Sequence, residues 1–193
     1  MLYLAKIQNA KPPLILLCCL IISACCDQRI LPKHDVKLSI SPSTTTFAYK
    51  QPVKLHLTFE NKGNEKINIS TMTDGNLWAI SLTRDGVPVV ARETYVRYRN
   101  GLKMLISKKF SSLAPGGTVS TVWTSNMDTQ QQAQSLQFVR FDPEGYHAAA
   151  LYNVGQPGNY TMTIIYRHGN PWAQPLDVFV GETNEATVSF SVM

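Results

Sequence analysis

The sequence predicts an all-β fold, an antiparallel immunoglobulin-like β-sandwich of about seven to nine strands with one short polar helix. Apolar and polar residues alternate in several short segments, which is typical of strands with one buried face. Turn signals rich in Gly, Pro, Asn and Asp separate these segments. The 193 residues, 44% hydrophobic and 16% charged, suffice for about one domain with a hydrophobic core.

Period-two alternation predicts most of the strands. It is clearest in residues 53–60, and the turn sequence Asn61-Lys62-Gly63-Asn64 is expected to lead into a return strand that begins at Ile67. The other predicted strands are residues 36–41, 77–84, 87–90, 102–110, 119–123, 137–141, 159–167 and 186–192.

Two further local predictions concern residues 77–86 and 126–154. Trp78, Ile80 and Leu82 are expected on one face of their strand, which the turn Arg84-Asp85-Gly86 closes as a hairpin. The Gln-rich segment Asn126–Leu136 is the one plausible helix, with Ser125 or Asn126 as its cap. Residues 142–154 are expected to be irregular.

Residues 1–24 have the features of a targeting segment. Lys6 and Lys11 supply positive charge, residues 14–22 form an apolar run, and Ser23-Ala24 are the small residues that a signal peptidase requires. Prolines at positions 12 and 13 shorten the apolar run, so it is too short for a permanent membrane-spanning helix.

Ile22-Ser23-Ala24-Cys25 resembles the lipobox of bacterial lipoproteins. The resemblance implies that the Cys25 thiol takes a diacylglycerol and that this lipid holds the chain on a membrane of the bacterial cell envelope. It divides the chain into a signal peptide (1–24), a lipidated tether (25–35) and a β-sandwich domain (36–193). Alternatives are an ordinary secretory signal cut after Ala24, or an uncleaved anchor.

The family's sorting rule places Asp directly after the lipidated cysteine for inner-membrane retention. Here Cys26 occupies that position and Asp27 follows, so the outer membrane is the default expectation. Cys18 and Cys19 leave with the signal, and Cys26 is then the only thiol left, which excludes an intramolecular disulfide.

Charge and motifs exclude several function classes. The chain has 18 basic and 13 acidic residues, and removal of Lys6 and Lys11 leaves 16 against 13, a mild excess with no nucleic-acid-binding motif. No His-Glu-x-x-His, Gly-x-Ser-x-Gly or Gly-rich phosphate loop occurs. The four scattered histidines are expected at the surface. We therefore expect no catalytic residue, no metal site, no cofactor and no nucleic-acid partner.

Four segments together resemble the immunoglobulin-like domains that precede the catalytic domain in secreted zinc endopeptidases of the deuterolysin and lysine-specific type. These segments are Leu57–Gly63, Ile80–Gly86, Leu113–Gly116 and Gly158–Tyr160. The zinc-binding motif of those enzymes is absent. The resemblance therefore implies an accessory domain that stands alone on a lipid anchor.

Two groups of loop residues are candidate partner-binding sites: Tyr95, Arg97, Tyr98 and Arg99 in one, and Trp172 in the other. They are residue types enriched at interface hot spots. The alternative is that the tyrosines pack under a sheet edge and that Trp172 covers one end of the sandwich.

The segment from Arg167 to Trp172 also resembles the late loop of chagasin-type cysteine-protease inhibitors, although that family's early Asn-Pro-Thr-Thr-Gly loop is missing and only residues 71–75 lie near its place. The leading prediction is a membrane-anchored, non-enzymatic lipoprotein that binds an unidentified protein or peptide. The alternative is a protease-directed module, inhibitory or accessory, that uses residues 71–78 and 170–172. A hydrolase with an unrecognised site is a third possibility.

Overall fold

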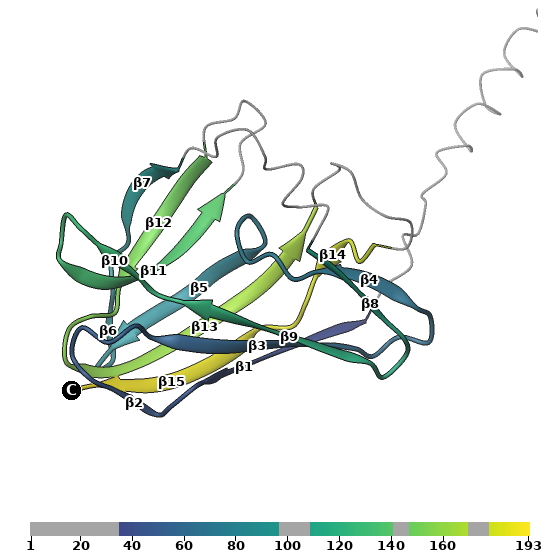
Figure 1. The fold of residues 1–193 in the computed structure, drawn as a ribbon, viewed down its shortest axis with the longest axis horizontal. Helices are drawn as coiled ribbons and strands as arrows, with labels where there is room; N and C mark the ends of the chain where they lie inside the picture. Colours follow the sequence, from purple (N-terminus) through teal and green to yellow (C-terminus); the bar gives the residue numbers. More distant parts are fainter. Residues whose placement is uncertain (1–34, 97–108, 141–146, 170–177) are drawn as a thin grey trace, which may run out of the picture. The chain divides into compact units, whose positions relative to one another are not determined.

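The computed structural model describes residues 35–96, 109–140, 147–169 and 178–193 (Figure 1). Residues His34–Met193 form one compact unit. The described residues contain fifteen strands and no helix, so the predicted all-β class is confirmed. The predicted number of seven to nine strands is too low, because short strands such as β2 (Thr46–Phe47) and β14 (Gly181–Glu182) carry too few residues to show alternation. Nowhere in the described ranges is there a helix long and apolar enough to cross a membrane.

Two main sheets form the sandwich, and their strand orders are those of an immunoglobulin-like domain. All neighbouring strands of the two sheets are antiparallel except β2 and β15. The first sheet has the order β1 (Val36–Pro42), β3 (Lys54–Asn61), β9 (Thr118–Thr124). The second has the order β2 (Thr46–Phe47), β15 (Ala186–Val192), β13 (Gly158–His168), β5 (Leu77–Arg84), β6 (Val87–Pro88), with β14 (Gly181–Glu182) also on β13.

Aromatic and aliphatic side chains from both sheets fill the core. The predicted alternation in residues 53–60 is confirmed, since its four apolar members are all buried. Phe59 from the first sheet contacts Tyr166 from the second edge to face, with ring centroids 4.9 Å apart. Tyr160 stacks on Phe190 at 5.2 Å within the second sheet. Such pairs contribute about 0.5–1.5 kcal/mol each beyond the burial of their area.

A β-bulge in β5 changes which of its residues face the core. The register between β5 and β13 shifts at Thr163/Ile164, so Ile80 is an extra residue with no partner of its own. Leu77 and Leu82 belong to the core cluster, whereas Trp78 and Ile80 do not. The prediction of one apolar face for Trp78, Ile80 and Leu82 is therefore wrong, because the bulge reverses the alternation between Ile80 and Leu82.

A third sheet has the order β10 (Asn126–Asp128), β11 (Ala133–Arg140), β12 (His147–Asn153), β7 (Arg92–Val96). Phe138 joins it to the core through edge-to-face contact with Trp123 at 4.8 Å. Arg92 Nη2 and Asp128 Oδ2, from the two outermost strands of this sheet, lie 2.7 Å apart. The hydrogen bond from Arg92 lowers the pKa of Asp128. The prediction of an irregular segment over 142–154 is wrong for His147–Asn153, which form β12.

The predicted helix Asn126–Leu136 is wrong: the segment forms β10, a tight turn and the first half of β11. Residues 133–136 are buried on both faces of the sheet, so no alternation is visible in the sequence. The turn depends on Asp128, whose Oδ1 accepts a hydrogen bond from Gln130 N at 3.0 Å, and on Gln132, which has a φ of 49°. The secondary structure of this segment is therefore determined by its burial in the tertiary structure and not by its local propensity.

The strand that begins at Ile67 is confirmed, but it does not return along β3. β4 (Ile67–Ser70) pairs with β8 (Phe110–Leu113) in a separate two-stranded sheet. The buried side chain of Asn61 redirects the chain at this point. Its Nδ2 donates to Glu65 O at 2.7 Å and to Leu113 O at 3.2 Å, and its Oδ1 accepts from Gly63 N at 3.0 Å.

Substitution Asn61→Ala removes these three hydrogen bonds, of which the one to Leu113 O is buried and the other two are partly buried. We expect the free energy of unfolding of the full chain to fall by about 2–3 kcal/mol, measured by urea denaturation. Asn64→Ala, at an exposed position of the same turn, is the matched control and should change it by less than about 0.5 kcal/mol. Equal effects of the two substitutions would contradict the role of Asn61.

Candidate functional site

The candidate site lies where three strands end. β7 ends at Val96, β11 ends at Arg140, and β12 begins at His147. Val96 is paired with His147, and Arg140 is paired with Ala148, so these strand ends are neighbours. We use the name Trp78 surface for the five residues that gather here: Trp78, Tyr95, Arg140, Ala148 and Arg167.

Three members of the Trp78 surface form a row across the third sheet. Ala148 lies opposite Tyr95 on one side and opposite Arg140 on the other. Residues opposite each other on antiparallel strands project from the same face, with Cβ atoms about 4.5–5.5 Å apart. Tyr95 is 79% exposed. The interpretation that it packs under a sheet edge is therefore wrong for this tyrosine.

Trp78 connects this row to the second main sheet. The guanidinium carbons of Arg140 and Arg167 each lie 5.0 Å from the centroid of its ring. Each cation–π contact at a partly exposed site is worth about 0.5–1 kcal/mol. Ile165, directly opposite Trp78 on β13, is covered although it lies outside the core cluster. The bulge at Ile80 makes this arrangement possible because it leaves Trp78 on the outer face.

The two arginines differ in their electrostatic partners. Arg167 Nε lies 2.7 Å from Glu182 Oε1, and both side chains are partly exposed, so solvent screens this pair. Within the described ranges, Arg140 forms no ion pair. The Trp78 surface thus presents an exposed guanidinium over the ring of Trp78, with the exposed Tyr95 on the far side of Ala148. This arrangement suits a partner with carboxylates and flat apolar groups.

A buried polar pair lies under this end of the domain. Asn76 Nδ2 donates to Met72 O at 2.9 Å, so the Asn76 Oδ1 atom, 3.1 Å from His168 Nδ1, is the acceptor. His168 therefore carries its proton on Nδ1, and its buried Nε2 has no partner among the described residues. Arg167 N also donates to Asn76 O, at 2.8 Å. These bonds fix residues 71–76 against the end of β13.

The expectation of surface histidines is right for His56 and wrong for two others. His147 and His168 are both buried. The sequence around His168 shows ordinary strand alternation, and its amide partner Asn76 lies 92 residues away. A polar residue whose partner is this remote in sequence cannot be identified as buried from local pattern.

The structure describes one of the predicted site residues. Tyr95 belongs to the Trp78 surface, whereas Cys25, Arg97, Tyr98, Arg99 and Trp172 lie outside the described residues. Sequence reasoning missed Trp78, Arg140 and Arg167 as a group. A tryptophan in an apolar strand is usually a core residue, and no local signal identifies the bulge that turns it outward.

The described residues contain no cluster of three potential metal ligands.

No protein-family model matches the chain, and no curated protein matches it significantly. Among solved structures, it is similar to the CARDB domain of the PF1109 protein from Pyrococcus furiosus, described in complex with di-metal ions, at 12% identity over 82% of this chain and 93% of that chain (TM-score 0.35). It is also similar to PapD-like domain 7 of human CEP192, at 9% identity over 100% of this chain and 96% of that chain (TM-score 0.30). Likenesses this distant carry no argument about family or activity.

The burial of His168 predicts a pH dependence of stability. Burial lowers the pKa of His168 below 6.5 in the folded state, so the unfolded chain binds the proton more tightly. The free energy of unfolding should be constant above pH 6.5 and fall as the pH drops below it, with a slope of at most about 1.4 kcal/mol per pH unit. Urea denaturation between pH 5 and pH 7.5 measures this slope.

His168→Gln should remove most of the slope, and His56→Gln, at an exposed position, should leave it intact. Asp128 does not contribute to this slope, because its pKa is lowered from 3.8 in the folded state. Its protonation therefore reduces stability only at a pH below the range of the measurement. An unchanged slope in His168→Gln would show that this histidine is not buried in its neutral form.

Proposed function

We propose that the chain is a membrane-anchored lipoprotein of the bacterial cell envelope whose β-sandwich is a non-enzymatic module that binds a protein or peptide. The observation that carries the binding function is the Trp78 surface. It gathers Tyr, Trp and Arg, the residue types that dominate interface hot spots, at partly exposed positions on rigid strands. The candidate residues Arg97, Tyr98 and Arg99 follow directly in sequence after the strand that carries Tyr95.

The anchor rests on the sequence Ile22–Cys25 and its apolar, positively charged flank. Two or three acyl chains at Cys25 would hold the chain stably, since each buried CH₂ contributes about 0.8 kcal/mol. Residues 27–35 would then reach roughly 30 Å from the lipid when extended at about 3.3 Å per residue. We place the anchor in the outer membrane by default, because Cys26 stands where the retention signal would stand.

A protease-directed module, inhibitory or accessory, is the second candidate. It rests on the sequence resemblance to the accessory domains of deuterolysin-type endopeptidases and to chagasin-type inhibitors. One structural observation favours it: the hydrogen bonds of Asn76 hold residues 71–76 against Arg167 and His168. The end of the first segment with the inhibitor-like resemblance therefore lies beside the start of the second. Potent inhibition of a papain-type cysteine protease by the full chain would favour this candidate over the first.

Cys25→Ser tests the anchor. In cells that express the full chain, the substitution should abolish incorporation of labelled fatty acid and move the protein from the membrane fraction to the soluble fraction, because the thiol that takes the lipid is gone. Cys26→Ser is the matched control and should retain both properties. Membrane retention of Cys25→Ser at the wild-type level would contradict the lipoprotein proposal.

Site-specific photo-crosslinking in cells tests the binding function. A photoreactive residue at position 95 should give a covalent adduct with a partner, and the same residue at position 122 should not. Val122 is a suitable control because it is 52% exposed and lies on the outer face of the first sheet. Arg140→Glu should weaken the adduct at position 95 about tenfold, as expected for loss of a hot-spot residue. Equal adducts at both positions, or none, would contradict the proposal.

A further inference from the structure

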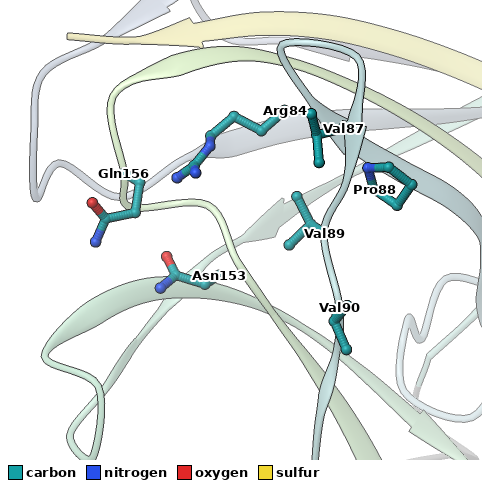
Figure 2. Close-up of a pocket in the computed structure, with 7 residues that line it drawn as sticks. All are labelled: Arg84, Val87, Pro88, Val89, Val90, Asn153 and Gln156. Atoms are coloured by element: carbon teal, nitrogen blue, oxygen red, sulfur yellow. The ribbon is translucent and has the colours of Figure 1, made fainter.

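A cavity of about 230 Å³ lies at the other end of β5 from Trp78, between the β5–β6 hairpin and the turn that joins β12 to β13 (Figure 2). Arg84 lies six positions after Trp78 in β5, so the two places are roughly 20 Å apart along the strand. The cavity is lined by Arg84, Val87, Pro88, Val89, Val90, Asn153 and Gln156.

The lining has a polar side and an apolar side. Figure 2 shows the Arg84 guanidinium and the Asn153 and Gln156 amides on one side, and the valines on the other. Val90 is 86% exposed and Val87 is 66% exposed, which is unusual for aliphatic side chains on a short strand and its continuation. Among the residues that the structure describes, none with a carboxylate side chain contributes to the lining.

Arg84 is held in place by its neighbours. Asp85 and Gly86 have φ values of 51° and 80°, as a tight two-residue hairpin requires, and Asp85 Oδ1 accepts from Asn159 N at 2.9 Å. The stem of Arg84 packs on Gly158, where an added Cβ would lie 2.8 Å from Arg84 Cγ. The guanidinium lies beside the Tyr160 hydroxyl, which donates to Gln156 O at 2.8 Å.

The guanidinium of Arg84 is adjacent in sequence to the carboxylate of Asp85 but is not paired with it. In the part of the chain that the structure describes, it forms no ion pair. The adjacent carboxylate of Asp85 uses Oδ1 to accept two hydrogen bonds from Asn159. A guanidinium that is positioned but unpaired recognises a carboxylate strongly, through two parallel charge-assisted hydrogen bonds.

An added β-strand does not suit this place. Val89 N donates to Leu82 O on β5, so the nitrogen of the preceding residue, Pro88, faces the outer edge of β6. Proline has no N–H, and the outer edge therefore lacks a donor where an added strand would need one. The occupant must be a compact group that enters the cavity from its open side.

We propose that this cavity binds a carboxylate attached to a short branched alkyl group. The carboxylate pairs with Arg84 and accepts from the Gln156 side-chain amide, and the alkyl group packs on Val87, Val89 and Val90. About 230 Å³ is smaller than the cavities that hold drug-sized ligands, so only a few non-hydrogen atoms fit. The C-terminal residue of a peptide and a free branched-chain acid both carry this chemistry.

Methyl NMR of the full chain in detergent micelles tests the site. The probes are isovalerate, acetyl-Ala-Val with a free C-terminus, and the same peptide as its C-terminal amide. We expect at least one of the two acids to shift the methyl signals of Val89 and Val90 at millimolar concentration, and the amide to bind about tenfold more weakly than the free peptide. Tighter binding of the peptide would identify a C-terminus as the source, and tighter binding of isovalerate would identify a free acid.

Two variants and one control make the test decisive. Arg84→Gln should weaken binding of the acid about tenfold. Val90→Asp, at a position too exposed to disturb folding, should have the same effect through repulsion of the carboxylate. Lys54→Gln, which removes a positive charge at an exposed position of the first sheet, should leave binding unchanged. Equal binding of the acid and the amide, unchanged binding in Arg84→Gln and Val90→Asp, or no methyl shifts with any probe would overturn the proposal.

Discussion

The pairing of β5 with β13, with Ile80 as an extra residue, is the constraint on which both proposed sites depend. On one side of the bulge Leu82 faces the core opposite Met162, and on the other Leu77 faces it opposite Tyr166. The change of alternation between them leaves Trp78 outside, where two guanidiniums lie over its ring. Without the extra residue, a regular strand would have placed either Leu77 or Leu82 on the outer face. The bulge thus converts an apolar strand into a core element with an outward-facing aromatic residue.

The rest of the domain fixes the surroundings of this strand. The third sheet is attached through Phe138 and supplies Arg140 and Tyr95 to the Trp78 surface. Asn76 and His168 fix the segment that leads into β5 by hydrogen bonds to each other and to the neighbouring backbone. At the opposite end, the Asp85-Gly86 hairpin and Tyr160 position Arg84. Both arginine-containing sites are therefore built from strands and tight turns, which hold side chains more rigidly than long loops do.

Much of the fold could be predicted from the sequence, because strands with one buried face show alternation and tight hairpins use specific residues. The strand around Leu55 and the Asp85-Gly86 turn are examples. The predicted helix at residues 126–136 failed because β11 is buried on both faces, which hides its period. The candidate site was predicted only at Tyr95. Trp78, Arg140 and Arg167 come together through a bulge and a sheet-to-sheet contact, and long-range packing creates both.

The central claim is that Trp78 lies on the outer face, next to Arg140, and not in the core. Incorporation of 5-fluorotryptophan into the full chain gives one ¹⁹F signal for each of the three tryptophans, and Trp78→Phe assigns the signal of interest. A soluble paramagnetic agent should broaden the Trp78 signal far more than that of the buried Trp123, and Arg140→Gln should shift it. A Trp78 signal as protected as that of Trp123 and unchanged in Arg140→Gln would contradict the account.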